Sequence, residues 1–386
     1  MKQTLPTNPF SRPRGYLPAC LSGDSRGCSR GDFFARLQGF SPGGSCARLA
    51  VLAVSAGLGL GGLEPQAADA QVSSIVWHDV GDPGNAPWTD DRYENLKFFG
   101  RGQVNHRYRM SETELTVSQW IEFARAYGPF ADNPLSDDIT GSYINAGYID
   151  DELQYKIKTG TAQYPTDVNW RMAARFANWM HNDQVNEAWA FESGAYDTST
   201  FGINDDYPPL YSDQTTRSPG AKYWIPSMDE WMKAVYYDPN KNGDGQGGWW
   251  EQPNGSDTPL IVGLPSEGGQ TNSSLALVYG RKGDHLNAGQ YPDVRTPWGL
   301  LDASGGQAEW TEEWRDWVQT DRHIRGSDFD DYANEGFIWD WIGEEHRTDD
   351  PAFTGLTGFR IAMVPAVPTL MPIGTLFLII TRRSRI

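Results

Sequence analysis

Cysteine decides which thiol or soft-metal chemistry a chain can perform, and all three cysteines lie near the N-terminus. Cys20, Cys28 and Cys46 precede Ala68-Asp69-Ala70, a small-x-small pattern that predicts signal-peptidase cleavage before Gln71. A thiolate is required for a cysteine nucleophile and is the ligand that copper(I) prefers. We therefore expect a mature protein with no disulfide, no thiolate nucleophile and no cysteine metal ligand.

The other residue types that often catalyse reactions form no recognisable motif. No Gly-x-Ser-x-Gly elbow is present, although a Ser/His/Asp arrangement in space stays open. Gly305-Gly306 lacks the lysine of a phosphate-binding loop. Six scattered histidines show no His-x-x-x-His-x-Glu pattern, and we expect neutral surface or loop residues: His78, His106, His181, His285, His323 and His346.

Two loop regions combine carboxylates with tryptophans. Asp238–Asp244 matches the first ligand positions of an EF-hand loop, but Trp249 stands where the bidentate glutamate belongs. A solvated Gly/Asp turn is the alternative that we favour. Trp249-Trp250 and Trp339-Asp340-Trp341 have the composition of a sugar- or peptide-binding rim. Buried tryptophans that stabilise a strand-poor fold are the alternative, and we favour it.

The two ends of the chain predict export and sorting. Leu49–Leu63 is an apolar run between a basic leader and the cleavage pattern, so we interpret residues 1–70 as leader and signal peptide. A disordered leader is the alternative.

Residues 364–386 combine prolines, a short apolar stretch and a terminal arginine cluster, whose charges favour the cytoplasmic side. Through Pro365-Ala366-Val367-Pro368 this tail resembles PEP-CTERM-like signals recognised by exosortase-type sorting machinery. A buried final strand is the alternative.

The acidic balance limits the classes of partner. The chain has 386 residues and a formal net charge of −18, and residues 71–370 hold 22 basic against 46 acidic side chains. A nucleic-acid surface needs clustered Lys and Arg, so we expect no nucleic-acid partner. Aromatic residues make up 13% of the chain, which argues against a disordered acidic protein. We expect membrane contact only through the C-terminal tail.

Three capping signals predict helices in the acidic body. Thr116 with Gln119 and Ser227 with Glu230 form capping boxes before apolar residues at helical spacing. Asp167 or Asn169 opens a third helix, which continues to Met180. The strand-like segments, Lys222–Ile225 and Phe359–Met363, are short. These patterns predict few helices, brief strands and long ordered loops.

Val80–Ala86 and Trp231–Asn242 resemble the exported, sorting-tagged branch of the formylglycine-generating-enzyme (sulfatase-modifying-factor) family, and six ordered motifs resemble the family as a whole. They lie at Tyr108–Trp120, Tyr164–Ala174, Ile225–Trp231, Thr296–Trp310, Arg325-Gly326-Ser327 and Gly358-Phe359-Arg360. The resemblance implies a single α+β domain of formylglycine-generating-enzyme and C-type-lectin-like fold, with little regular secondary structure. We place this domain at 100–363 and an N-terminal extension at 71–99.

The resemblance also implies what chemistry to look for. The family oxidase uses a copper-binding cysteine pair after its Arg-Gly-Gly-Ser motif, but here Asp328, Asp330 and Asp331 follow Ser327, so we expect no copper. The family also has a structural calcium site. Carried over by residue, that site gives side-chain ligands Asp302 and Glu309 and carbonyl ligands Gly305 and Gln307. The alternative is that Asp302 caps a turn and Glu309 pairs with an arginine; Gly306 replaces the family's asparagine.

Two hypotheses of function follow. The first is a non-catalytic, calcium-stabilised module that binds a glycan or protein at the cell surface. The second is a divergent formylglycine-generating oxidoreductase that modifies a sulfatase cysteine. The missing cysteine pair favours the first, so no catalytic residue is assigned. We expect the protein in the periplasm, at the cell surface or in the extracellular matrix.

Overall fold

The three helices predicted from their capping signals are all present in the computed structural model. Thr116 and Ser227 make both reciprocal bonds of a capping box, opening α1 (Val117–Tyr127) and α5 (Met228–Tyr236). Asn169, rather than Asp167, caps α3 (Trp170–His181) by accepting from the Met172 backbone N–H. Asp167 instead accepts from the Ser142 N–H at 2.9 Å.

The structure describes residues 74–204, 210–273, 275, 285–315, 319–331, 339–345, 347–353, 355 and 357–365. The predicted leader and the sorting tail beyond 365 lie outside these residues. Within the described part, no helix has both the length and the apolar character needed to cross a bilayer.

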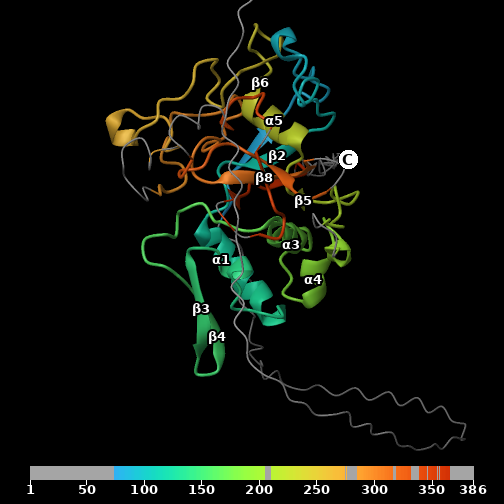
Figure 1. Cartoon of the computed structure of the whole chain (residues 1–386), viewed down its shortest axis with the longest axis vertical. Coiled ribbons are helices and arrows are strands. Elements are labelled where there is room, and N and C mark those ends of the chain that lie inside the picture. The colour runs from blue at the N-terminus through green and yellow to red at the C-terminus, as the bar shows by residue number, and fades with distance from the viewer. Residues whose placement is uncertain are drawn as a thin grey trace, which may run out of the picture. The chain divides into compact units, whose positions relative to one another are not determined.

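The strands are short and form two four-stranded sheets and two hairpins (Figure 1). The first sheet has the order β1-β2-β12-β5: Trp77–Val80, Tyr108–Ser111, Ala362–Met363 and Tyr223–Trp224. The second has the order β10-β9-β8-β11: Thr348–Asp349, Arg322–Arg325, Ala308–Trp314 and Thr357–Gly358. The hairpins pair β3 (Ile144–Ile149) with β4 (Glu152–Ile157) and β6 (Tyr237–Asp238) with β7 (Gly248–Trp249).

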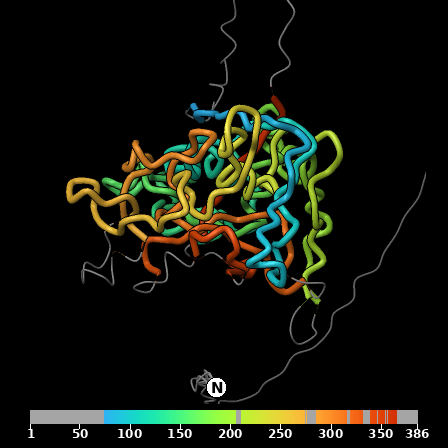
Figure 2. The backbone as a smooth tube through the Cα atoms, turned by 90° about the horizontal axis from the view of Figure 1, so that it is seen from above, coloured from blue at the N-terminus to red at the C-terminus, as the bar shows by residue number. Residues whose placement is uncertain are grey.

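Irregular segments connect these elements. In Figure 2 the chain between α5 and β8, coloured yellow to orange, runs mostly as loops. The remaining regular pieces are one turn or slightly more: α2 (Asp137–Thr140), α4 (Ala188–Glu192), η1 (Asp91–Tyr93), η2 (Gly128–Phe130), η3 (Thr198–Thr200) and η4 (Pro265–Glu267). Mixed helices and strands with little regular structure make this an α+β fold.

Buried aromatic rings hold the helices to the sheets. Trp120 of α1 stacks on Phe176 of α3 at 5.8 Å between centroids, and both rings contact Phe359, next to β12. A second cluster forms around Trp231 and Met232 of α5. Buried aromatic surface is the main driving force available to a fold with so few ladder hydrogen bonds.

Three of the tryptophans considered for a binding rim, Trp249, Trp250 and Trp341, make contacts within the fold. Trp341 packs against Trp88 and Tyr93, and Trp249 donates its indole N–H to the Ala86 carbonyl at 3.1 Å. Trp250 donates to Asp238 within the hairpin β6–β7, whose turn contains the EF-hand-like residues. Trp249, Trp250 and Trp341 are half-buried. Their contacts within the fold agree with the structural alternative, and the rim hypothesis stays a prediction.

Candidate functional site

The residues of the predicted calcium site lie in the loop that leads into β8. Asp302, Gly305 and Gly306 all have positive φ angles, 55°, 79° and 65°. A Cβ on Gly305 would collide with the Asn272 side-chain oxygen, so this position requires glycine. The loop is fixed from outside by Ser327, whose hydroxyl accepts from the Gly305 N–H at 2.9 Å.

Glu309 is buried at the start of β8 and is paired with an arginine. The Arg360 Nε lies 2.8 and 2.9 Å from the two Glu309 oxygens, and Trp231 donates its indole N–H to Glu309 at 2.7 Å. Burial nevertheless raises the pKa of Glu309, and Arg360 opposes that shift. The arginine pairing weighed as the alternative for this residue is therefore present.

Asp302 is enclosed and lies between two small cavities. Its Oδ2 accepts from the Gly289 N–H at 2.5 Å, and burial raises the pKa of the carboxyl group. Each cavity has a volume of about 10 Å³, near the minimum that holds one water molecule or one ion. Asp302, Tyr291 and Ser304 line both cavities.

Glu114 lies close to Asp302 and Glu309, in the loop before α1. The sequence analysis did not single it out. Its Oε1 accepts from the Gln307 N–H at 2.9 Å, while its buried Oε2 has no hydrogen-bond partner. It lines one of the two cavities with Asp302 and Asn272. Burial, followed by the charges of Asp302 and Glu309, raises the pKa of Glu114 well above its ordinary value.

Glu114 also explains why residue 306 is glycine. A Cβ at Gly306 would collide with the Glu114 carboxylate. An asparagine, the family's residue here, would need Glu114 to move. The Glu114 side chain therefore takes the space that the larger residue would fill.

Gly306→Ala is expected to destabilise the protein more than Gly100→Ala. Both glycines have positive φ, so each substitution carries a backbone cost of about 1–2 kcal/mol. Gly100 has open space where a Cβ would lie, whereas Gly306 faces Glu114, which adds about 1–3 kcal/mol. Urea unfolding of the two variants measures the difference; equal costs would show that Glu114 does not crowd this loop.

The cluster formed by Glu114, Asp302 and Glu309 has one cation, Arg360, against three carboxyl groups, of which Glu114 and Glu309 are buried and Asp302 is half-buried. Such an arrangement must take up a proton or a further cation. Within the described residues, no three His, Cys, Asp or Glu side chains form a group that could hold a metal. A metal bound here would therefore need carbonyl or amide oxygens in addition to carboxylates.

The aspartates after Ser327 are engaged in an ion-pair cluster. Arg347 pairs with both Asp328 and Asp331, at 2.7 Å for the latter. Burial raises the pKa of Asp331 to about 7, against the effect of Arg347. Phe329 packs on the ring of His285 at 3.8 Å between centroids. These side chains directly follow, or pack against, the segment after Arg325-Gly326-Ser327.

For His323, the predicted neutral state agrees with the structure and the predicted surface or loop position does not. His323 lies in β9 with 1% of its surface exposed, and burial, followed by the Lys97 charge, lowers its pKa to about 3. It is therefore neutral, as expected, but it is a core strand residue rather than a surface or loop one.

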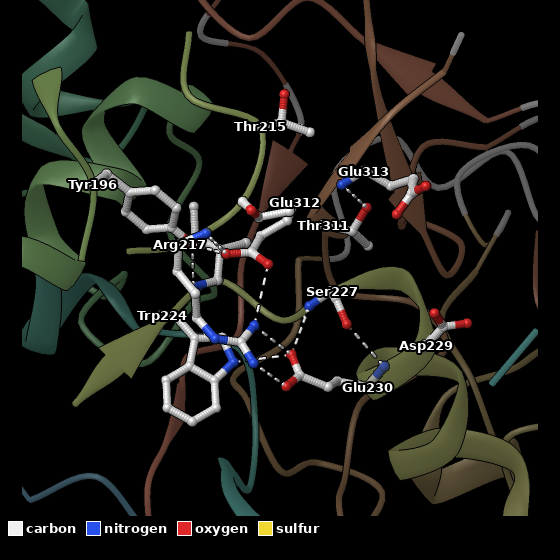
Figure 3. A network of polar contacts seen from close by, with 12 residues as sticks. Tyr196, Thr215, Arg217, Trp224, Ser227, Asp229, Glu230, Thr311, Glu312 and Glu313 are labelled. Carbon is white, nitrogen blue, oxygen red and sulfur yellow. Dashed lines mark hydrogen bonds and ion pairs between the residues drawn. The ribbon is translucent and has the colours of Figure 1, made fainter. Parts of the chain in front are cut away.

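A second polar site surrounds Arg217, and the sequence analysis missed it (Figure 3). The Arg217 guanidinium lies between Glu230 of α5 and Glu312 of β8, at 2.6 and 3.2 Å, and stacks 4.2 Å over the Trp224 ring. Tyr196 donates its hydroxyl to Glu312 at 2.7 Å. Arg217 and Glu230 are 13 residues apart, but Glu312 lies 95 residues after Arg217, so only the fold brings the three charged groups together.

The two carboxylates of this site differ in proton affinity. Burial raises the pKa of Glu312 to about 7, and Arg217 opposes this shift. Burial acts in the same direction on Glu230, but hydrogen bonds from His106, Arg217 and the Ser227 N–H outweigh it and lower the pKa to about 2. Near neutral pH, Glu230 is therefore ionised while Glu312 is partly protonated.

Three solved structures are similar to this chain. Treponema denticola variable protein 1 has a TM-score of 0.45 and 16% identity, covering 76% of this chain and 98% of its own. CarF has a TM-score of 0.44 and 16% identity, covering 76% and 99%. PvdO from Pseudomonas aeruginosa has a TM-score of 0.42 and 13% identity, covering 75% and 94%. No protein-family model matches the chain, and no curated protein matches it.

Proposed function

We propose that this chain is an exported, non-catalytic binding module of the formylglycine-generating-enzyme and C-type-lectin-like type, stabilised by calcium. Its loops would contact a glycan or protein at the cell surface. The observation that carries the calcium proposal is the Glu114 Oε2, which is buried without a partner beside Asp302 and a cavity of about 10 Å³. A buried, unpartnered carboxylate oxygen is costly unless a proton or a cation satisfies it, and the calcium proposal takes the second of these.

The residues present fit a calcium ion. Ca²⁺ takes six to eight oxygen ligands from carboxylates, amides and backbone carbonyls. Asp302 and Glu114 would supply charge, and the Gly305 and Gln307 carbonyls would complete the proposed set. Glu309 is held by Arg360 and Trp231, so we propose that it supports the loop while Glu114 takes its place as a ligand. Bound calcium would stabilise the fold and supply no reaction step.

The non-catalytic part of the proposal rests on the sequence after Ser327. Residues 71–386 contain no cysteine, so a thiolate pair for copper(I) is missing from that range. Asp328 and Asp331, which follow the Arg-Gly-Ser motif, are neutralised by Arg347. The export and sorting signals lie outside the described residues and stay part of the proposal.

Removing calcium is expected to lower the melting temperature. At a free calcium concentration about 100 times the dissociation constant, binding adds about 2.7 kcal/mol, which corresponds to several degrees. We expect one calcium and no copper per chain by elemental analysis, with a lower melting temperature in EDTA. Asp302→Asn should abolish the calcium-dependent shift.

Asp244→Asn serves as the matched control, because Asp244 belongs to the EF-hand-like turn outside the proposed site. It should leave the calcium-dependent shift unchanged. A melting temperature that does not respond to EDTA would rule out the calcium site. Stoichiometric copper, or oxygen consumption with a Cys-x-Pro-x-Arg peptide, would overturn the non-catalytic assignment.

A further inference from the structure

A further cavity lies in front of the Arg217 network, and none of its lining residues belongs to the proposed calcium loop. Its volume is about 590 Å³, within the range of small-molecule sites. His106, Arg107, Arg217, Trp224 and Val364 line it, together with the Ser218–Ala221 turn. We call this surface the Arg217 groove.

One edge of the Arg217 guanidinium donates no hydrogen bond to the described residues. The two Nη1 hydrogens point to Glu230 and Glu312, and one Nη2 hydrogen points to Glu230. Arginine has five N–H donors, so the Nε–H and the second Nη2–H remain, and no described residue accepts from them. These two donors lie side by side, and the side chain is 22% exposed. Two parallel N–H groups match the two oxygens of a carboxylate.

The Trp224 ring and the two carboxylates hold this edge in place. The guanidinium stacks on Trp224 at 4.2 Å, while Glu230 binds both Nη atoms. Arg217 therefore cannot rotate freely, and a ligand that meets the free edge would not have to order the side chain. Figure 3 shows the guanidinium lying between the two carboxylates and above the indole.

The mouth of the groove adds positive charge in an otherwise acidic protein. Arg107 is exposed and pairs with no carboxylate in the described part of the chain. The His106 side chain is 48% exposed and donates from Nε2 to Glu230. Glu312 also lines the groove, and together with Glu230 it offsets the charge of Arg217. The unpaired Arg107 and the free donors of Arg217 are the groups that favour an anionic ligand.

We propose that the Arg217 groove binds the carboxylate of an acidic saccharide, with the free edge of Arg217 as its fork and Arg107 as a second contact. The inference rests on the proposed binding role and names its ligand class. A uronic acid carries a planar carboxylate and hydroxyls, and Thr216 and Ser218 line the groove beside Arg217. Peptide binding by strand addition has little to pair with here, because the adjacent edge strand β5 is only two residues long.

The test titrates the full-length protein with trigalacturonate by calorimetry, in buffer without added calcium. We expect saturable binding, at least about tenfold weaker binding of the neutral methyl ester, and chemical-shift changes at the Trp224 indole N–H. Arg217→Lys keeps the charge but loses the fork, so it should weaken binding at least about tenfold. Arg107→Gln removes an exposed, unpaired charge, so it should weaken binding without disturbing the core.

Arg125→Gln is the matched control, because Arg125 is exposed on α1, remote in sequence from every groove residue. Its affinity should equal that of the wild type. No binding of trigalacturonate, equal binding of the ester, or unchanged affinity in both groove variants would overturn the inference. Arg217-dependent binding of trialanine but not of trigalacturonate would overturn the saccharide assignment. If trigalacturonate does not bind but calcium does, the groove inference is wrong and the calcium proposal is unaffected.

Discussion

Replacing Arg360 with methionine is expected to lower the free energy of unfolding by about 3–5 kcal/mol, because Glu309 would remain as a buried charge without its counter-ion. Both residues are essentially inaccessible to water, and the Nε of Arg360 contacts both Glu309 oxygens. Arg360 also donates to the Glu112 carbonyl at 2.6 Å and to the Leu301 carbonyl. Methionine has a similar length, so lost volume contributes little. Urea unfolding in EDTA measures the effect without any contribution from calcium.

Two further variants separate ion pairing from packing. Arg125→Met breaks the exposed pair with Glu122 on α1 and should cost less than about 1 kcal/mol. The double variant Glu309→Gln/Arg360→Met removes the stranded charge and should recover part of the loss. If Arg360→Met is no more destabilising than Arg125→Met, the pair does not hold β8 to the segment before β12.

The helices were predictable because their signals are local. A capping box needs only four consecutive residues, so Thr116–Gln119 and Ser227–Glu230 contain all the information about where α1 and α5 begin. The choice between Asp167 and Asn169 was not local. The Asp167 side chain accepts a hydrogen bond from the Ser142 hydroxyl instead, and Ser142 lies 25 residues earlier in the chain. The strands were predictable only as short segments, since their partners come from distant parts of the sequence.

The candidate calcium loop was predicted in part. The positive φ at Gly305 and the burial of Asp302 agree with a tight turn that carries a carboxylate. Glu114 was missed because it lies 188 residues before Asp302 and looks, in the sequence, like an ordinary residue ahead of a helix. Gly306, where the resemblance implies an asparagine, was the available signal. A lost side chain in a tight loop implies that another group fills its space, here Glu114.

The Arg217 network could not be predicted, because neither residue type nor spacing marks it. Glu230 was recognised for its role in the capping box, and this role is real, since its Oε2 accepts from the Ser227 N–H at 2.9 Å. The same carboxylate also binds Arg217, His106 and Trp224. One side chain thus caps the N-terminus of α5 and also binds the charged groups of this site. Such a double role becomes visible only when the fold brings α5, β8 and β5 together.

Glu312→Gln is expected to gain stability relative to the wild type as the pH rises. The pKa of Glu312 is about 7 in the folded protein because of burial, against 4.5 for a free glutamate. The unfolded chain therefore releases this proton first, and the wild type loses about 3 kcal/mol of stability between about pH 4.5 and pH 7. Glutamine cannot titrate, so the difference between the two unfolding free energies should grow by this amount across the window.

Glu230→Gln is the control, with the opposite electrostatics in the same network. The folded pKa of Glu230 is about 2, so its contribution is lost only as the pH falls below about 4.5. Its variant should be less stable than the wild type, and the difference should change less over this window than that of Glu312→Gln, because the Glu230 charge is only one of the causes that raise the pKa of Glu312. Tyr196, Arg217 and Arg322 face Glu312 and remain in both variants. Denaturation curves at several pH values measure the difference in unfolding free energy between each variant and the wild type. A flat difference for Glu312→Gln would show that Arg217 keeps Glu312 ionised throughout, and the Arg217 groove would then have two full negative charges beneath it.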